Sequence, residues 1–391
     1  MINRTNLRNL TILLGSTTTI LSATIIAPAL PQMAMDFGDV PNVDLLVRLT
    51  LTMPALFIAI GALFAGILLD RWGRKPVISI ALVLYGITGS AGYFLDSLVA
   101  ILVSRALLGL AVAGIMSGIT TLILDYFSGP RLNQFLGYQG ASIGLGGMVF
   151  LLLSGFLADI GWRYPFLVHL IAFLVLIGVI LFIDEPEAQT STEQKTQTGK
   201  PVFSWKTVAP IYVTAFVGMV VFFIFPVQLP FYLTEQSGAS TSLVGLALSA
   251  QTLSSVIVAL QFKRLKKRLS FVAIFSLVFV AFSINHFIVA LTPNYVLVII
   301  ALLIGGLGIG LFPPNIGAWL ASVVPPALRG RAVGGMTFAL FLGQFFSPII
   351  TQPLTKQIAI AGTFAAAAAV SLLVAVVFGM MRMRRSAKAE T

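Results

Sequence analysis

Residues 66–77 read GILLDRWGRKPV, a short polar stretch in a very apolar chain. Four of its side chains are charged: Asp70, Arg71, Arg74 and Lys75. Residues 51–69 before it and 77–95 after it contain no charged residue. A helix of about 20 apolar residues is long enough to cross the hydrocarbon core of a bilayer. The stretch is therefore interpreted as a charged connection between two membrane-spanning helices.

The composition of the whole chain agrees with this interpretation. Of its 391 residues, 58% are hydrophobic and 9% are charged, whereas soluble domains carry about 25% charged residues. The weak alternating segments of about 10 residues that are typical of membrane barrels are not found. We therefore expect an all-α integral membrane protein. With no Cys and two His, the sequence indicates no disulfide, no metal site and no cofactor.

Twelve apolar segments have the length of membrane spans. Their expected ranges are 10–30, 45–69, 77–95, 98–124, 134–158, 164–183, 208–233, 241–262, 270–291, 295–320, 332–354 and 358–380. The first is interpreted as a retained span, because no small-residue cleavage site follows it. A polar segment without apolar periodicity, residues 184–206, separates six spans from six. It predicts an N-terminal six-helix bundle (1–183), a cytoplasmic linker (184–206) and a C-terminal six-helix bundle (207–391).

The distribution of positive charge predicts the orientation. An even number of spans places both termini on one side, and 20 of the 24 Lys and Arg residues fall on that side. Arg48, Arg163 and Lys356 fall on the other side, and Arg105 lies within a span. Because basic loops face the cytoplasm, both termini are expected there. The net charge of +11 then reflects topology, and nucleic acid is not an expected partner.

The two halves of the chain resemble each other weakly. Arg131 precedes Gly137 by six residues, and Arg329 precedes Gly335 by six residues, each at the start of the fifth span of its half. Repeated six-helix halves are typical of alternating-access transporters, whose substrate site lies between the repeats near the middle of the membrane. No stretch matches GxxxxGK[ST], so nucleotide is not an expected partner, and no enzymatic activity is indicated.

Several motifs resemble the major facilitator superfamily, and within it the bacterial twelve-span drug/proton antiporter-like group. Gly66-x-x-x-Asp70-Arg71-x-Gly73-Arg74-Lys75 resembles the family's signature between spans 2 and 3. The pair Arg105 and Gly109 is similar to an Arg-x-x-x-Gly pattern in span 4, and residues 155–166, GFLADIGWRYPF, resemble the usual entry to span 6. The resemblance covers essentially the whole chain. It implies two pseudo-symmetric six-helix bundles, a bacterial cytoplasmic (inner) membrane location, a monomer and a proton gradient as the energy source.

Two features depart from that group. Residues 140–155, GASIGLGGMVFLLLSG, lack the proline of the antiporter signature in span 5. Span 1 has no Asp or Glu between residues 10 and 30, where many proton-coupled members keep a carboxylate. The proton carrier is therefore not assigned from the sequence.

The loop between spans 2 and 3 has two interpretations. Its cations alone would fix the orientation of the chain, but this topological role requires neither Asp70 nor Gly73. A carboxylate here can face the positive N-terminal end of span 11, and the resemblance implies an Arg74–Asp125 contact. The gating interpretation, in which the halves meet here while the protein faces outward, assigns the motif residues Gly66, Asp70, Arg71, Gly73, Arg74, Lys75 and Asp125.

Candidates for the substrate cavity are polar residues within spans. Arg105 is about seven residues into its span, and a charge at such a position costs about 2.5–3.5 kcal/mol. We expect it to face the bundle interior; the alternative is that it reaches the outer interface. The uncharged candidates are Thr18, Ser22, Gln139, Gln228, Gln251, Asn315 and Gln344. Each could instead form a hydrogen bond between helices. His169 and His286 are expected to pack, and Asp159 and Arg163 to form a local ion pair.

These features predict a secondary transporter that works by alternating access. The leading function is proton-coupled efflux of a small organic or amphipathic compound. The alternative is uptake or facilitated diffusion of a specific solute, such as a sugar or an organic acid. A membrane sensor without transport activity is disfavoured, because no soluble domain is present beyond the linker.

Overall fold

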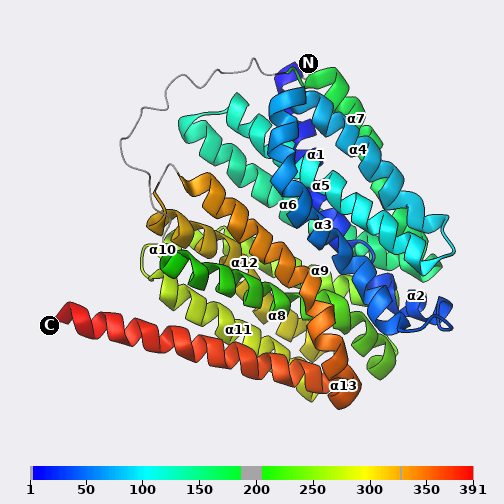
Figure 1. Cartoon of the computed structure of the whole chain (residues 1–391). Helices are drawn as coiled ribbons and strands as arrows, with labels where there is room; N and C mark the ends of the chain where they lie inside the picture. The colour runs from blue at the N-terminus through cyan, green and yellow to red at the C-terminus, as the bar shows by residue number, and fades with distance from the viewer. Residues whose placement is uncertain (1–2, 186–204, 326–327, 391) are drawn as a thin grey trace.

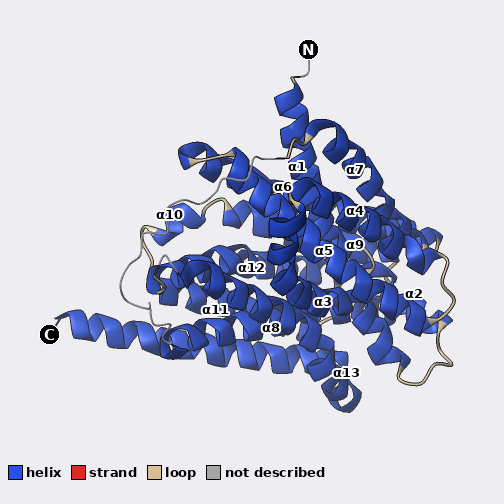
Figure 2. Ribbon diagram, turned by 45° about the horizontal axis from the view of Figure 1, so that its top comes forward, coloured by secondary structure: helices blue, strands red, loops and turns tan. Residues whose placement is uncertain are grey.

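The computed structural model describes residues 3–185, 205–325 and 328–390, and every regular element in these ranges is helical (Figures 1 and 2). In chain order the α-helices are α1 (Arg4–Thr24), α2 (Leu30–Asp36), α3 (Val43–Trp72), α4 (Arg74–Ser90), α5 (Leu98–Tyr126), α6 (Gly129–Ile160), α7 (Ile171–Phe182), α8 (Trp205–Ser237), α9 (Thr241–Ala259), α10 (Phe262–Lys266), α11 (Phe271–Leu291), α12 (Tyr295–Val323) and α13 (Arg329–Glu390). Short 3₁₀ segments are η1 (Ala27–Ala29), η2 (Ala91–Tyr93) and η3 (Tyr164–Leu170). Helices satisfy their own backbone hydrogen bonds, as a chain in lipid must.

The predicted all-helical fold with twelve spans is confirmed. Eleven described helical segments are long and apolar enough to cross a membrane. The last of them contains two non-helical residues, Ile358 and Ala359, at which α13 turns back on itself (Figure 1), so it supplies two spans. Span 1 is divided into α1, η1 and α2, since Pro28 and Pro31 lack the backbone N–H that a continuous helix needs. Most of the predicted linker, residues 186–204, lies outside the described residues.

Two ends of the molecule can be distinguished from the direction of the chain. The linker end carries the start of α1, the α3–α4 and α5–α6 connections, the end of α7 and the start of α8. The far end carries the α2–α3, α6–η3 and α8–α9 connections and the turn within α13. We call α1–α7 the N-half and α8–α13 the C-half. In Figure 1 the N-half lies above the C-half. Helix α2 marks the far end, and the labels of both chain ends lie away from it.

The hydrophobic core is shared between the halves at the far end and divided at the linker end. One buried cluster combines the N-half with far-end residues of the C-half, such as Phe225, Leu233 and Val244. The second cluster contains C-half residues nearer the linker end, such as Phe275, Phe312 and Trp319. Leu174, Leu373 and many other large apolar side chains remain exposed, as expected of a surface that contacts lipid. The halves are therefore packed asymmetrically.

Candidate functional site

The α3–α4 connection is held by a carboxylate from the end of α7. Glu185 accepts hydrogen bonds from the backbone N–H groups of Arg74 (2.6 Å) and Lys75 (2.7 Å), the first residues of α4, where a negative charge is favoured. Gly73 has φ +87°, and a Cβ there would lie 2.7 Å from a Glu185 oxygen. Both observations require glycine at position 73. The topological interpretation of the loop did not account for this residue.

The other charges of this loop divide into two groups. Arg74 Nε lies 3.0 Å from Asp125 Oδ2, so the contact that the resemblance implied is present and joins α4 to α5. Lys75 Nζ donates to the carbonyl of Ile180 at 2.8 Å. Asp70 and Arg71 are exposed at the end of α3, and neither side chain has a hydrogen bond or ion pair with any described residue. The part of the loop predicted to face span 11 therefore has no partner among the described residues in this conformation.

Small residues show that the two halves separate toward the linker end. No atom from elsewhere in the described fold lies within 4 Å of the position that a Cβ would take at Gly66 in α3, at Gly137 or Gly140 in α6, or at Gly334 in α13. At the far end of α6 the opposite holds. A Cβ at Gly155 would lie 2.7 Å from the carbonyl oxygen of Thr241 in α9. The halves are thus in close contact at the far end and apart at the linker end.

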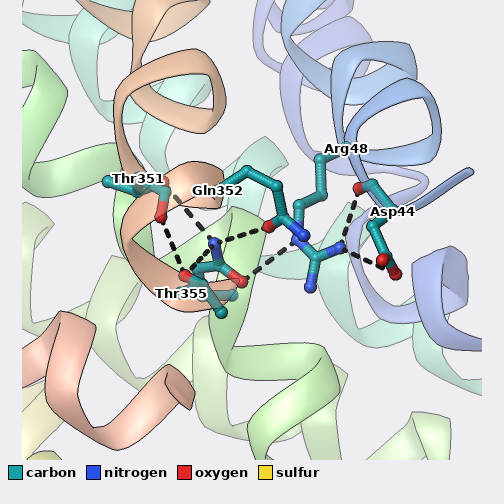
Figure 3. A network of polar contacts seen from close by, with 6 residues as sticks. Asp44, Arg48, Thr351, Gln352 and Thr355 are labelled. Carbon is teal, nitrogen blue, oxygen red and sulfur yellow. Dashed lines mark hydrogen bonds and ion pairs between the residues drawn. The ribbon is translucent and has the colours of Figure 1, made fainter. Parts of the chain in front are cut away.

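A buried arginine joins the halves between α3 and α8 (Figure 3). Arg48 is 3% exposed. Its Nε donates to Gln228 Oε1 at 3.1 Å, its Nη1 donates to the carbonyl of Asp44 at 2.7 Å, and its Cζ lies 3.8 Å from the ring centre of Phe231. The ion pair with the half-exposed Asp44 carboxylate is long, 3.8 Å. Gln228 Nε2 in turn donates over 3.3–3.5 Å to residues of α13: Thr351, Gln352 and Thr355.

A second contact joins the halves between α6 and α9. Asp159 Oδ1 accepts from the Thr241 backbone N–H (3.0 Å), the Thr241 hydroxyl (2.5 Å) and the Ser242 N–H (3.4 Å), so it caps the start of α9. The predicted local ion pair of Asp159 with Arg163 is therefore wrong. Arg163 Nη2 instead lies 2.8 Å from Asp96 Oδ1. The prediction failed because each residue has a partner that is distant in the sequence. Asp96 and the start of α9 both lie at the far end, where they contact Arg163 and Asp159, respectively.

Arg105 lies inside the N-half and does not reach the outer interface. It is 0% exposed, and its Nε and Nη2 donate to the carbonyls of Thr50 (3.2 Å) and Ser22 (2.6 Å). Its Nη1 lies 3.4 Å from His169 Nε2, while His169 Nδ1 lies 2.9 Å from the carbonyl of Phe166. A carbonyl only accepts, so Nδ1 donates and Nε2 accepts from Arg105. All three guanidinium nitrogens are thus occupied within the N-half.

The uncharged candidates do not gather in one place. Thr18 and Ser22 are buried in α1 and donate to carbonyls of their own helix. The half-buried Gln139 donates to Ser16 at 3.2 Å within the N-half. The remaining three belong to the C-half: Gln251, whose Nε2 has no described partner, Asn315, which donates to the Phe271 carbonyl, and the half-buried Gln344, near Met219 Sδ. Gln228 differs from these residues because it accepts a hydrogen bond from a side chain of the opposite half, Arg48.

Three residues of these contacts were missed from the sequence: Arg48, Asp159 and Glu185. Arg48 was treated as a charge outside the membrane, although it is the sixth residue of α3. The predicted span 45–69 places it only four residues from the outer end, so the depth argument applied to Arg105 did not extend to it. Among the described residues no group of three or more His, Asp or Glu could hold a metal ion.

One family model matches nearly the whole chain. The family model described as Major Facilitator Superfamily matches residues 12–270 and 211–391. Multidrug resistance protein 1 of Bacillus subtilis (strain 168) is 30% identical over 152 residues, 39% of this chain and 39% of the relative. The niacin transporter NiaP of Acinetobacter baylyi (strain ATCC 33305 / BD413 / ADP1) is 33% identical over 111 residues, 28% and 25% of the two chains. The chain thus spans less than half the length of each of these two relatives. The structure of the nucleoside transporter NupG superimposes with a TM-score of 0.79 over 96% of this chain and 98% of that one, at 13% identity.

Proposed function

Because the chain belongs to the major facilitator superfamily, whose members are secondary transporters and not enzymes, we propose that it exports a small organic or amphipathic compound by alternating access. The asymmetric packing of the halves supports the alternating-access part of this proposal. The far end is closed by the Arg48–Gln228 and Asp159–Thr241 contacts, and the linker end is apart around Gly66 and Gly137. Such an arrangement is one of the two states that alternating access requires.

The opposite state follows from the same residues. When the far end opens, the linker end closes, and the unpaired Asp70 approaches the start of α13, whose N-terminal end is positive. The Arg74–Asp125 and Glu185 contacts keep the loop rigid during this movement, because they lie within the N-half. Asp70 is then a gate residue, and the bases of the loop set the orientation.

The orientation, location and oligomeric state belong to the same proposal. The chain is a multi-pass membrane protein. We place the linker end and both termini in the cytoplasm, because that end carries most of the basic residues. The bacterial relatives support the cytoplasmic membrane as its location. The two halves of one chain can form the whole pathway, so the working unit is a monomer.

Export of organic compounds is supported by the relative named for multidrug resistance, and proton coupling is part of this proposal. The position of the acidic residues favours a second candidate. Every described Asp and Glu lies in a loop or within two residues of a helix end, so no described carboxylate is placed at mid-membrane to carry a proton. Facilitated diffusion or uptake of a specific solute requires no such group, and a relative is named for niacin transport.

Flux measurements in proteoliposomes separate these candidates. The purified chain would be reconstituted with a pH-sensitive dye in the lumen, and solute efflux would be started by dilution. Proton-coupled export predicts a change of lumenal pH that follows the solute, whereas facilitated diffusion predicts flux without a pH change. Absence of flux for every solute tested, organic cations and anions included, would contradict the transport function.

A further inference from the structure

We propose that one edge of the Arg48 guanidinium binds a carboxylate of the transported compound, so that the protein selects organic anions over organic cations. The inference rests on the proposed function, because the site is reached when the far end opens and an exported compound meets it there before release. It assigns a ligand chemistry to one of the three basic residues that do not follow the positive-inside distribution.

The contacts of Arg48 leave a specific pair of donors for a ligand. One face of the guanidinium lies against Phe231, and Nη1 is bound to the backbone of Asp44. The remaining edge consists of Nε and Nη2. Nε donates to the side-chain oxygen of Gln228, whereas Nη2 donates to none of the described residues. In Figure 3 one terminal nitrogen of Arg48 has no dashed line. Two parallel N–H groups on one edge of an arginine match the two oxygens of a carboxylate.

The present partner of that edge is neutral and loosely held. Gln228 Oε1 is a single amide oxygen, and its Nε2 is fixed only by three long contacts of 3.3–3.5 Å. A carboxylate brings an opposite charge and a second oxygen, so it can accept from both N–H groups of this edge at once. A carboxylate can therefore displace Gln228 once the seam between α3 and α8 opens.

The carboxylates near Arg48 do not fully neutralise its positive charge. The nearest carboxylate, Asp44, lies 3.8 Å from Nη1, on the other edge, and its side chain is 53% exposed. Glu235 also acts on Arg48 from a distance, and it too is exposed. A buried cation whose direct hydrogen bonds go to neutral acceptors is incompletely compensated, and a bound anion supplies the missing charge.

Arg105 does not compete for this role, although the sequence singled it out. Its three nitrogens are all occupied inside the N-half, whereas Arg48 lies where the halves meet. A cationic compound would meet Arg48 without any described mid-span carboxylate to bind it. Cations are thus disfavoured for two reasons: the positive charge of Arg48 repels them, and no described mid-span carboxylate is available to pair with them.

Ligand binding to the purified full-length chain tests the site directly. The probes are four carboxylates (benzoate, salicylate, indole-3-acetate and octanoate), the neutral amide benzamide and the cation tetraphenylphosphonium, compared by thermal shift at constant ionic strength. At least one carboxylate is expected to stabilise the protein, and benzamide and tetraphenylphosphonium are not. Arg48→Gln should weaken the apparent affinity for that carboxylate at least about tenfold, and Arg48→Lys should restore part of it.

The matched control removes a positive charge at the same end of the molecule. Lys356 is exposed and follows Thr355 directly, so Lys356→Gln should leave carboxylate binding unchanged. The proposal is overturned if no carboxylate stabilises the protein, if tetraphenylphosphonium stabilises it as well as any carboxylate, or if Arg48→Gln binds like the wild type. In proteoliposomes, flux of tetraphenylphosphonium without carboxylate flux would keep the transport function and reject the anion site. Carboxylate binding without any flux would keep the site and reject transport.

Discussion

The closeness of α6 and α9 at the far end allows a substitution that should open that end selectively. A Cβ at Gly155 would lie 2.7 Å from the carbonyl oxygen of Thr241, 2.9 Å from the Cα of Ser242 and 3.2 Å from the Cα of Gly245. All three atoms belong to the backbone, so Gly155→Ala must push the helices apart. Overpacking of this kind costs about 1–3 kcal/mol. Because the strain exists only while the far end is closed, the population of the open state should rise about 5- to 150-fold.

Thiol labelling reports this shift, because the chain contains no Cys. Ser249 in α9 is 3% exposed and its hydroxyl oxygen lies 3.1 Å from the Met148 carbonyl oxygen of α6, so a Ser249→Cys reporter is reached by maleimide when this seam opens. While the open state is rare, the labelling rate is proportional to its population, and Gly155→Ala should raise the rate about 5- to 150-fold. The control is Gly137→Ala on the same helix, where no atom from elsewhere lies within 4 Å of the Cβ position. Equal labelling of the two variants would refute the reasoning.

Three further substitutions test other contacts. Asp159→Asn weakens the cap on α9 and should raise labelling of Ser249→Cys by about tenfold at most, since the carboxylate is exposed; an unchanged rate would show that the cap does not hold the halves. Asp70→Asn removes the charge proposed to stabilise the opposite state and should lower that rate about 2- to 5-fold; no decrease would leave the topological interpretation of the loop. Arg105→Leu leaves the carbonyls of Ser22 and Thr50 unsatisfied and should lower the melting temperature clearly, whereas an unchanged melting temperature would contradict its structural role.

The spans were predictable because each one carries its own signal. A run of about 20 apolar residues identifies a membrane helix without any knowledge of its neighbours, and the glycine at position 73 and the charges of its loop mark the α3–α4 connection in the same local way. The turn within α13 was predicted from residues 358–380 for the same reason. The break of span 1 into α1, η1 and α2 follows from Pro28 and Pro31 but had not been predicted.

The gate contacts were not predictable, because their partners are distant in sequence. Arg48 meets Gln228, 180 residues later, and Asp159 meets Thr241, 82 residues later. Both pairings depend on how two helices from different halves face each other, which hydropathy does not determine. The assumption that nearby opposite charges pair led to the wrong partner for Asp159. Arg105 could be placed in the interior from its depth alone, but its three partners could not be named.

Distances between spin labels at the two ends test the central claim, that the ends open in alternation. The linker-end pair would join Arg131→Cys in α6 to Lys267→Cys after α10, and the far-end pair would join Asp39→Cys to Gln236→Cys; all four positions are exposed. In lipid nanodiscs, adding Gly155→Ala to each pair should lengthen the far-end distance and shorten the linker-end distance in the same fraction of molecules. A far-end distance that lengthens while the linker-end distance stays fixed would contradict alternating access by this chain.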